Sequence, residues 1–218
     1  MTRLAVFDCD GTLVDSAAAI CAAMDMAFDR LSLAPPSHAA TRRVVGLSLP
    51  EAMAMLLPDA EDRLHQQLAA IYRDAFTVVR SRPDFAEPLF PGALEALAAI
   101  EDAGWLLGVA TGKSDRGLAR VLKRHGLHAR FVTRQTADRH PSKPHPAMLR
   151  AAIADTGARH SVMVGDTVFD ITMARAAGVD ALGVAWGYHA PAELAAAGAR
   201  AVAPTFADLP ALLEDMPA

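Results

Sequence analysis

Cysteine is nearly absent from this chain, which has two among its 218 residues, Cys9 and Cys21. Two thiols cannot build the disulfide framework that stabilises many small secreted proteins, and their scarcity is typical of proteins in a reducing compartment. We therefore predict a cytoplasmic location. A cysteine-dependent phosphatase would need an arginine six positions after its cysteine, and after Cys9 that position holds Asp15.

Long apolar runs are also missing, although 52% of the residues are hydrophobic. No stretch approaches the roughly 18 consecutive apolar residues of a membrane-spanning helix. No charged start followed by an apolar segment, as in a secretory signal, is present either. We expect a soluble chain with a full hydrophobic core and no membrane partner, as a monomer or a homodimer.

Blocks of basic residues are lacking, and the net charge is −4 with both signs interspersed. This pattern argues against nucleic acid as a partner. Lysine itself is scarce, because only Lys113, Lys123 and Lys143 accompany the many arginines. A lysine in a distinctive position therefore suggests that a compact ammonium group is required there.

The most informative stretch lies near the N-terminus, where the apolar run Leu4–Phe7 ends in Asp8 and Asp10. The run predicts a buried strand, and in open α/β sheets ligands bind at the carboxyl ends of the strands. Two neighbouring carboxylates repel each other unless they share a cation or one binds a proton. Oxygen ligands favour Mg²⁺, and Gly11 permits a sharp turn beside it. Taken alone, the pair is equally consistent with a turn followed by a helix cap.

The second half of the chain alternates between strand and helix patterns. Strands are predicted at 105–110, 161–164 and 181–185, with a weaker one at 129–133. The intervening helices are predicted at 93–103, 115–125, 144–156 and 168–177, with a C-terminal helix near 206–214. Such alternation predicts βαβ units, a parallel sheet and an α/β core of Rossmann-like type.

Residues 16–85 contain only helix patterns and interrupt this alternation. Helices are predicted at 16–31, 38–45, 50–57 and 61–80, the first capped by Asp15 or Ser16. We therefore predict two domains. Residues 1–15 together with 86–218 form the core, and residues 16–85 form an inserted all-helical domain.

Further polar residues follow the other predicted strands. Thr111 and Gly112 could bind phosphate oxygens through a hydroxyl and a backbone N–H. The surrounding stretch does not match a nucleotide-binding P-loop, because Gly108 stands one residue too late in the pattern. Lys143 precedes Pro144, which we expect to begin a helix and so to fix the direction of the lysine side chain. Each of these residues, taken alone, also fits an ordinary helix cap or a solvated side chain.

Two more carboxylates complete the set. Asp166 ends a predicted buried strand, and Asp170 follows one helical turn later on the same face. Together with Asp8 and Asp10 they would place four acids at one edge of the sheet, which is costly without a cation. The sequence therefore predicts a metal site there.

The string Asp8–Ser16, followed in order by Thr111, Lys143 and Asp166 with Asp170, resembles the four motifs of the haloacid dehalogenase-like hydrolase superfamily, in its phosphoglycolate-phosphatase-like branch. The resemblance covers nearly the whole chain. It implies that Asp8 is the nucleophile that forms an aspartyl-phosphate and that Asp10 is the general acid and base. Mg²⁺ would be held by Asp8, by the backbone carbonyl of Asp10, and by Asp166 and Asp170.

The resemblance also implies that Thr111, Gly112 and Lys143 bind the transferring phosphoryl group. The helical insert corresponds to a mobile cap, in which Arg43, Gly46, Leu47 and Ser48 are expected to face the substrate. That substrate is a small phosphorylated metabolite. The segment Trp186–His189 either borders the site or forms a structural loop.

Other branches of the superfamily fit less well. Dehalogenases do not need the additional aspartates, and phosphonate-cleaving relatives need a cap lysine, which residues 16–85 lack. Sugar phosphomutases carry an arginine where this chain has Leu49. The sequence therefore favours phosphate monoester hydrolysis, with a sugar phosphomutase or a pyrophosphatase as alternatives.

Overall fold

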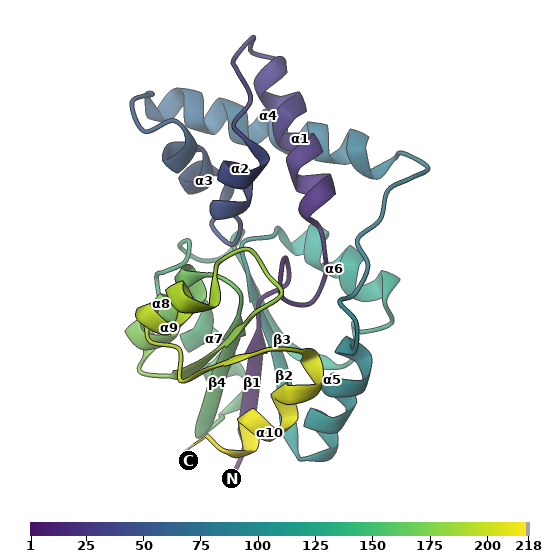
Figure 1. Cartoon of the computed structure of the whole chain (residues 1–218), viewed down its shortest axis with the longest axis vertical. Coiled ribbons are helices and arrows are strands. Elements are labelled where there is room, and N and C mark those ends of the chain that lie inside the picture. The colour runs from purple at the N-terminus through teal and green to yellow at the C-terminus, as the bar shows by residue number, and fades with distance from the viewer. Residues whose placement is uncertain (217–218) are drawn as a thin grey trace.

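A six-stranded sheet forms the centre of the molecule, in a computed structural model that describes residues 1–216 (Figure 1). All strand pairings are parallel, and the strand order is β3-β2-β1-β4-β5-β6. The strands are β1 Arg3–Phe7, β2 Trp105–Thr111, β3 Phe131–Thr136, β4 His160–Gly165, β5 Asp180–Val184 and β6 Ala201–Ala203. The predicted parallel α/β core is confirmed, with β1 between β2 and β4.

Helices cover both faces of this sheet. They are α5 Ala93–Asp102, α6 Asp115–Arg124, α7 Ala147–Thr156, α8 Val168–Ala177, α9 Pro191–Ala197 and α10 Leu209–Glu214, with a 3₁₀ turn at Phe206–Asp208. Side chains of β1 alternate between the two cores. Ala5 and Phe7 pack in the cluster that contains α5, α6 and α10 residues, whereas Leu4 and Val6 pack in the cluster of α7, α8 and α9. Because both faces are covered, the strand is apolar throughout.

Four helices are inserted between β1 and α5. They are α1 Ala17–Asp29, α2 His38–Arg43, α3 Leu49–Leu56 and α4 Asp62–Arg80. They have a hydrophobic core of their own, which includes Phe28, Met53 and Leu68. Figure 1 shows the insertion beyond the carboxyl ends of the strands. The helical insertion is thus confirmed, while the limits 16–85 of a separate domain remain a prediction.

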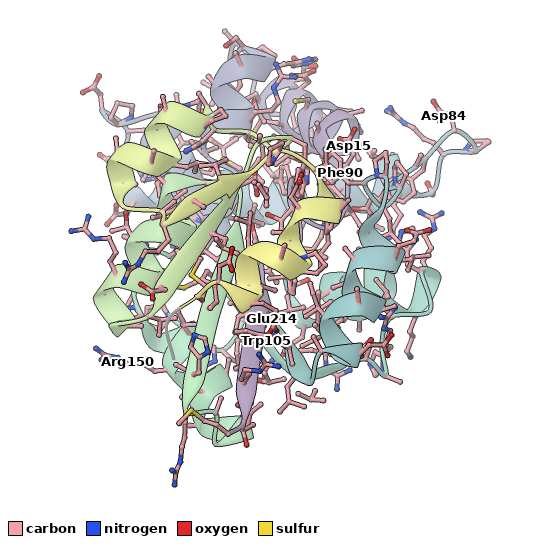
Figure 2. The ribbon with its side chains drawn as sticks, turned by 60° about the horizontal axis from the view of Figure 1, so that its bottom comes forward. Asp15, Asp84, Phe90, Trp105, Arg150 and Glu214 are labelled. Carbon is pink, nitrogen blue, oxygen red and sulfur yellow. The ribbon has the colours of Figure 1, made fainter. Side chains whose placement is uncertain are left out.

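The chain enters and leaves the insertion through two segments that lie side by side. Val14 and Leu89 form an antiparallel bridge, and the Asp15 N–H donates to the Pro88 carbonyl at 2.9 Å. Asp15 and Phe90 lie near each other in Figure 2. At the far end of the sheet, Glu214 accepts a 2.8 Å hydrogen bond from Trp105 Nε1 (Figure 2).

Three local predictions were wrong at least in part. Of the two expected caps of α1, the Asp15 carboxylate does accept from the Ala17 N–H at 3.2 Å, whereas the Ser16 hydroxyl does not cap the helix and donates to Asp10 Oδ1. Helix α7 begins at Ala147 rather than Pro144, because Pro146 disfavours helical backbone at the residue before it. Strand β3 begins at Phe131, since residues 128–130 form a turn first. Among residues 1–216, no helix is both long and apolar enough to cross a membrane.

Candidate active site

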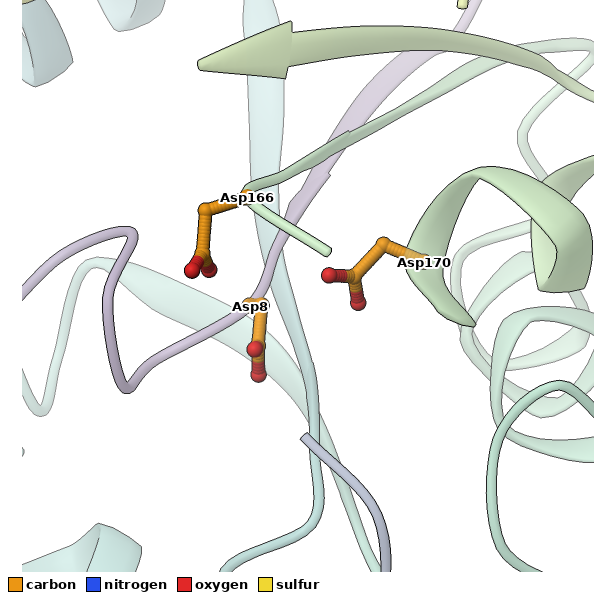
Figure 3. A group of neighbouring side chains, drawn as sticks. All are labelled: Asp8, Asp166 and Asp170. Carbon is orange, nitrogen blue, oxygen red and sulfur yellow. The ribbon is translucent and has the colours of Figure 1, made fainter. Parts of the chain in front are cut away.

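Three carboxyl groups meet at the carboxyl edge of the sheet. Asp8 directly follows β1, Asp166 directly follows β4, and Asp170 lies in the first turn of α8. All three are fully buried, and one oxygen of each lies within 4.8 Å of those of the other two. Figure 3 shows the three side chains converging from separate segments. The parallel topology therefore unites groups that are about 160 positions apart in sequence.

Lys143 supplies a buried positive charge to this cluster. Its Nζ lies 2.9 Å from Asp8 Oδ1 and donates a 2.6 Å hydrogen bond to Asp170 Oδ1. Burial alone would lower the pKa of Lys143, but the Asp170 and Asp8 carboxylates outweigh burial and raise it above its usual value. The lysine is therefore protonated.

Asp166 and Asp170 are held in place by hydrogen bonds from neighbouring segments. Asp166 accepts from Thr12 Oγ1 at 2.7 Å and from the Tyr188 backbone N–H at 2.9 Å. Asp170 Oδ2 accepts from the backbone N–H and the hydroxyl of Thr167. A side chain at residue 11 would have its Cβ 2.3 Å from Asp166 Oδ2, so glycine is required at this position. Thr12 and Thr167 are supporting residues that the sequence did not single out.

The cluster fits a divalent metal ion bound through oxygen. Burial, together with Asp170 and Asp10, raises the pKa of Asp8 to about 7, although Lys143 opposes this shift. Burial, together with Asp8 and Asp170, also raises the pKa of Asp166. One ammonium thus faces three carboxylates, and Asp8 Oδ2 has no hydrogen-bond partner among residues 1–216. A cation held by these oxygens would relieve both the repulsion and the unmet hydrogen-bonding capacity.

Asp10 is not part of the three-carboxylate cluster and belongs to a second network. Its Oδ1 accepts from the Ser16 hydroxyl and lies 2.8 Å from Lys113 Nζ. Lys113 also donates to the buried Glu87 at 3.3 Å. In the sequence, Lys113 stands out only as part of a stretch that fails to match a nucleotide-binding loop, and no motif contains Glu87. The scarcity of lysine, which drew attention to Lys143, applies equally to Lys113.

Thr111 and Gly112 lie at the end of β2, beside the insertion. The Thr111 hydroxyl is buried and accepts from the Lys113 backbone N–H at 3.2 Å. A Cβ at Gly112 would lie 2.4 Å from the carbonyl oxygen of Leu47 and 2.7 Å from that of Gly46. The missing side chain therefore lets the insertion close directly against the core.

The expected cap residues are only partly brought together. Gly46, Leu47 and Ser48 line a cavity that they share with Asp10, Gly112 and Lys113. The Ser48 backbone N–H donates to Ser142 Oγ at 2.8 Å. Arg43 does not line this cavity, because its guanidinium pairs with Glu193 of α9 at 2.7 Å. Its backbone carbonyl accepts from His189 Nε2 at 3.1 Å.

The segment Trp186–His189 borders the site. The Tyr188 hydroxyl lies 3.3 Å from Ser16 Oγ, and the Trp186 indole N–H donates to the Thr12 carbonyl at 3.0 Å. The segment therefore supports both carboxylate networks, since Ser16 bonds Asp10 and Thr12 bonds Asp166.

Comparisons with known proteins agree with this geometry. Residues 5–184 match the haloacid dehalogenase-like hydrolase family. The chain is 36% identical to the probable phosphatase IndB of Dickeya dadantii, over 96% of this chain and 92% of that protein. It is 33% identical to a phosphoglycolate phosphatase of Agrobacterium fabrum, over 86% of this chain and 82% of that one.

Solved structures show the same fold. A predicted phosphatase from Clostridium acetobutylicum superimposes with a TM-score of 0.88 at 22% identity, over 99% of this chain and 100% of that one. A putative β-phosphoglucomutase from Bacteroides vulgatus superimposes with a TM-score of 0.80 at 21% identity, over 98% of this chain and 88% of that one. The buried acidic cluster, the parallel sheet and the helical insertion accompany these matches. The chain is therefore an enzyme of the haloacid dehalogenase-like hydrolase family, similar to its phosphatases.

Proposed function

We propose that the protein hydrolyses phosphate monoesters of small metabolites, with Asp8 as the nucleophile. The observation that carries this proposal is the buried Asp8 carboxylate, which lies beside a protonated lysine and two further carboxylates at the carboxyl edge of the sheet. Such a site combines a nucleophile with the charge needed to accept a phosphoryl group.

The chemistry follows from two aspartates in different surroundings. An Asp8 oxygen attacks phosphorus, the bond from phosphorus to the ester oxygen breaks, and Asp10 donates a proton to the departing oxygen. Asp10 then takes a proton from the water that attacks the aspartyl-phosphate, which releases phosphate and restores Asp8. The position of Asp10 suits this exchange, because its carboxyl group is not one of the three clustered acids and is held in a fixed orientation by Ser16 and Lys113.

The phosphoryl group would be held by Thr111, Gly112 and Lys143. Because phosphoryl transfer depends mainly on positioning and charge neutralisation, a buried ammonium beside the nucleophile is well placed for this role. We propose Mg²⁺ as the metal, held by Asp8, the Asp10 backbone carbonyl, Asp166 and Asp170. When bound, it would neutralise charge on the phosphoryl oxygens.

Residues 16–85 would act as the cap that excludes water from the intermediate. The contact of Gly46 and Leu47 with Gly112 supports this role, because it brings the insertion over the phosphate-binding residues. The curated relatives make 2-phosphoglycolate a candidate substrate. A sugar phosphomutase or pyrophosphatase activity has no specific observation in its favour.

The test is phosphate release from a panel of phosphate monoesters, an aryl phosphate and pyrophosphate, with Mg²⁺ or with a chelator. We expect Mg²⁺-dependent release that Asp8→Asn abolishes. The matched control is Asp15→Asn, which removes an exposed carboxylate from the same segment. Absence of release from every compound by folded, Mg²⁺-loaded protein would refute the proposal.

A further inference from the structure

A cavity of about 420 Å³ separates the helical insertion from the core. One end reaches Asp10 and Lys113, and the walls come from α1, α3 and α4 of the insertion and from α6 of the core. Ile20, Met24 and Phe76 make part of the lining apolar. Because Asp10 is the proposed proton donor to the leaving group, the cavity adjoins the position that a leaving group would occupy.

Four arginines line this cavity, two from the insertion and two from the core. They are Arg73 and Arg80 on α4, and Arg116 and Arg120 on α6. Across residues 1–216, none of them lies within ion-pairing distance of a carboxylate. A chain with a net charge of −4 thus lines this one cavity with four arginines that form no ion pair. We name these four residues the arginine wall.

The acidic residues around the cavity do not neutralise this wall. Asp10 is engaged by Lys113, and Asp138 accepts a 2.8 Å hydrogen bond from the Asp115 backbone N–H. Burial and then the charges of Arg120 and Arg116 lower the pKa of Arg80, although Glu87 opposes them. Arg80 of α4 therefore lies close enough to Arg116 and Arg120 of α6 for their charges to repel, and an anion between them would relieve that repulsion.

A second observation points to a ligand in the same cavity. Thr41 lines it, is fully buried, and its hydroxyl has no hydrogen-bond partner among residues 1–216. A buried hydroxyl without a partner is unfavourable unless a ligand or water satisfies it. The Tyr72 side chain lines the same space.

We infer that this cavity binds the leaving group of the substrate and that the arginine wall recognises a second anionic group on it. This inference rests on the proposed phosphatase activity. The substrate is then a phosphate monoester whose organic part carries a polar group and a second anion, a carboxylate or a phosphate. Guanidinium groups suit this role because each can donate two parallel hydrogen bonds to either anion.

The experiment compares two matched series of substrates. One consists of phosphorylated ω-hydroxy acids with one to five methylene groups, and the other of phosphorylated diols of equal length, which lack the carboxylate. Bisphosphates of the same diols distinguish a carboxylate from a phosphate as the preferred second anion. The variant is Arg80→Gln with Arg120→Gln. The control is Arg63→Gln, an exposed arginine on α4 outside the cavity lining.

We expect wild type to prefer acids or bisphosphates over diol monophosphates by about tenfold or more in kcat/KM, because charge-assisted hydrogen bonds are lost in the diols. The double variant should raise KM for the doubly anionic substrates by a similar factor and should affect the diol monophosphates and the aryl phosphate far less, because these compounds lack the second anion. Arg63→Gln should change neither. Equal wild-type rates for acids, bisphosphates and diols, or a preference that survives in the double variant, would overturn the inference.

A readout without turnover separates this inference from the proposed function. If aryl phosphate is not hydrolysed, the hydrolase proposal fails, and thermal shifts with the same compounds then test the cavity alone. The doubly anionic compounds should stabilise wild type more than the diol monophosphates, and this difference should disappear in the double variant. Equal shifts with all compounds would overturn the inference.

Discussion

Replacing Asp8 with asparagine should stabilise the metal-free protein at alkaline pH, although it removes the proposed nucleophile. The pKa of Asp8 is raised from 3.8 to about 7 by burial and by neighbouring carboxylates. A raised pKa means that the folded state binds the proton more tightly than the unfolded state. The contribution of Asp8 to folding stability therefore falls as pH rises from 3.8 to about 7. In this window Asp8 has lost its proton in the unfolded chain but still keeps it in the folded protein.

The size of the effect follows from the shift. Each pKa unit corresponds to about 1.4 kcal/mol, so the raised pKa of Asp8 costs about 4 kcal/mol of stability at pH 8, where the folded group is charged, and about 2 kcal/mol at pH 5, where it must stay protonated. Asparagine keeps the shape but carries no charge. The variant should therefore exceed wild type in free energy of unfolding by amounts of this order, with the larger advantage at pH 8.

Denaturant unfolding in a chelator, at pH 5 and pH 8, measures this difference. Asp15→Asn is the control, because residue 15 is exposed and asparagine keeps an oxygen that can accept from the Ala17 N–H, so stability should change by less than about 0.5 kcal/mol. Saturating Mg²⁺ should shrink the advantage of the variant, since a ligand at about 100 times its Kd stabilises wild type by about 2.7 kcal/mol and the variant lacks one of its ligands. A variant less stable than wild type in chelator at pH 8, or an advantage independent of pH, would refute the reasoning.

Three other substitutions test the surroundings of the site. Lys143→Met should lower the free energy of unfolding by about 3–5 kcal/mol at pH 8, because it leaves buried carboxylates without their cation; a loss no greater than that of the exposed Lys123→Met would contradict this. Thr12→Val should weaken Mg²⁺ binding by about tenfold in calorimetry, because it removes the hydrogen bond that orients Asp166, and unchanged affinity would argue against that role. Gly112→Ala should displace residues 46–47 and lower kcat/KM by about tenfold, because overpacking costs about 1–3 kcal/mol. Unchanged amide exchange in residues 46–47 together with unchanged kinetics would contradict a close contact of the insertion with Gly112.

Much of the fold could be predicted from local patterns. The apolar run before Asp8 and the alternation of strand and helix patterns after residue 90 predict a parallel sheet, and the structure confirms it. The rule that parallel strands end at one edge then places Asp8, Thr111 and Asp166 at neighbouring strand ends. The absence of strand patterns between residues 16 and 85 likewise predicts the helical insertion that the structure contains.

The orientation of the remaining side chains could not be predicted in this way. Ser16 has the sequence position of a helix cap, yet it bonds Asp10, because β1 and α1 bring the two together. Arg43 was expected to contact the substrate, yet its side chain pairs with Glu193, which is 150 positions away. Glu87 lies in a connecting segment without any motif and becomes the partner of Lys113 only because the chain re-enters the core there.

Local sequence patterns were enough to predict the strands, most of the helices, the acidic strand ends and thus the family. Which charges are paired became visible only in the folded chain, where Lys113 and Arg43 have carboxylate partners and the arginine wall has none among residues 1–216. The two kinds of information differ in range. Hydrophobic periodicity and turn chemistry act over a few residues, whereas charge pairing depends on contacts within a few ångströms between segments that lie far apart in the chain.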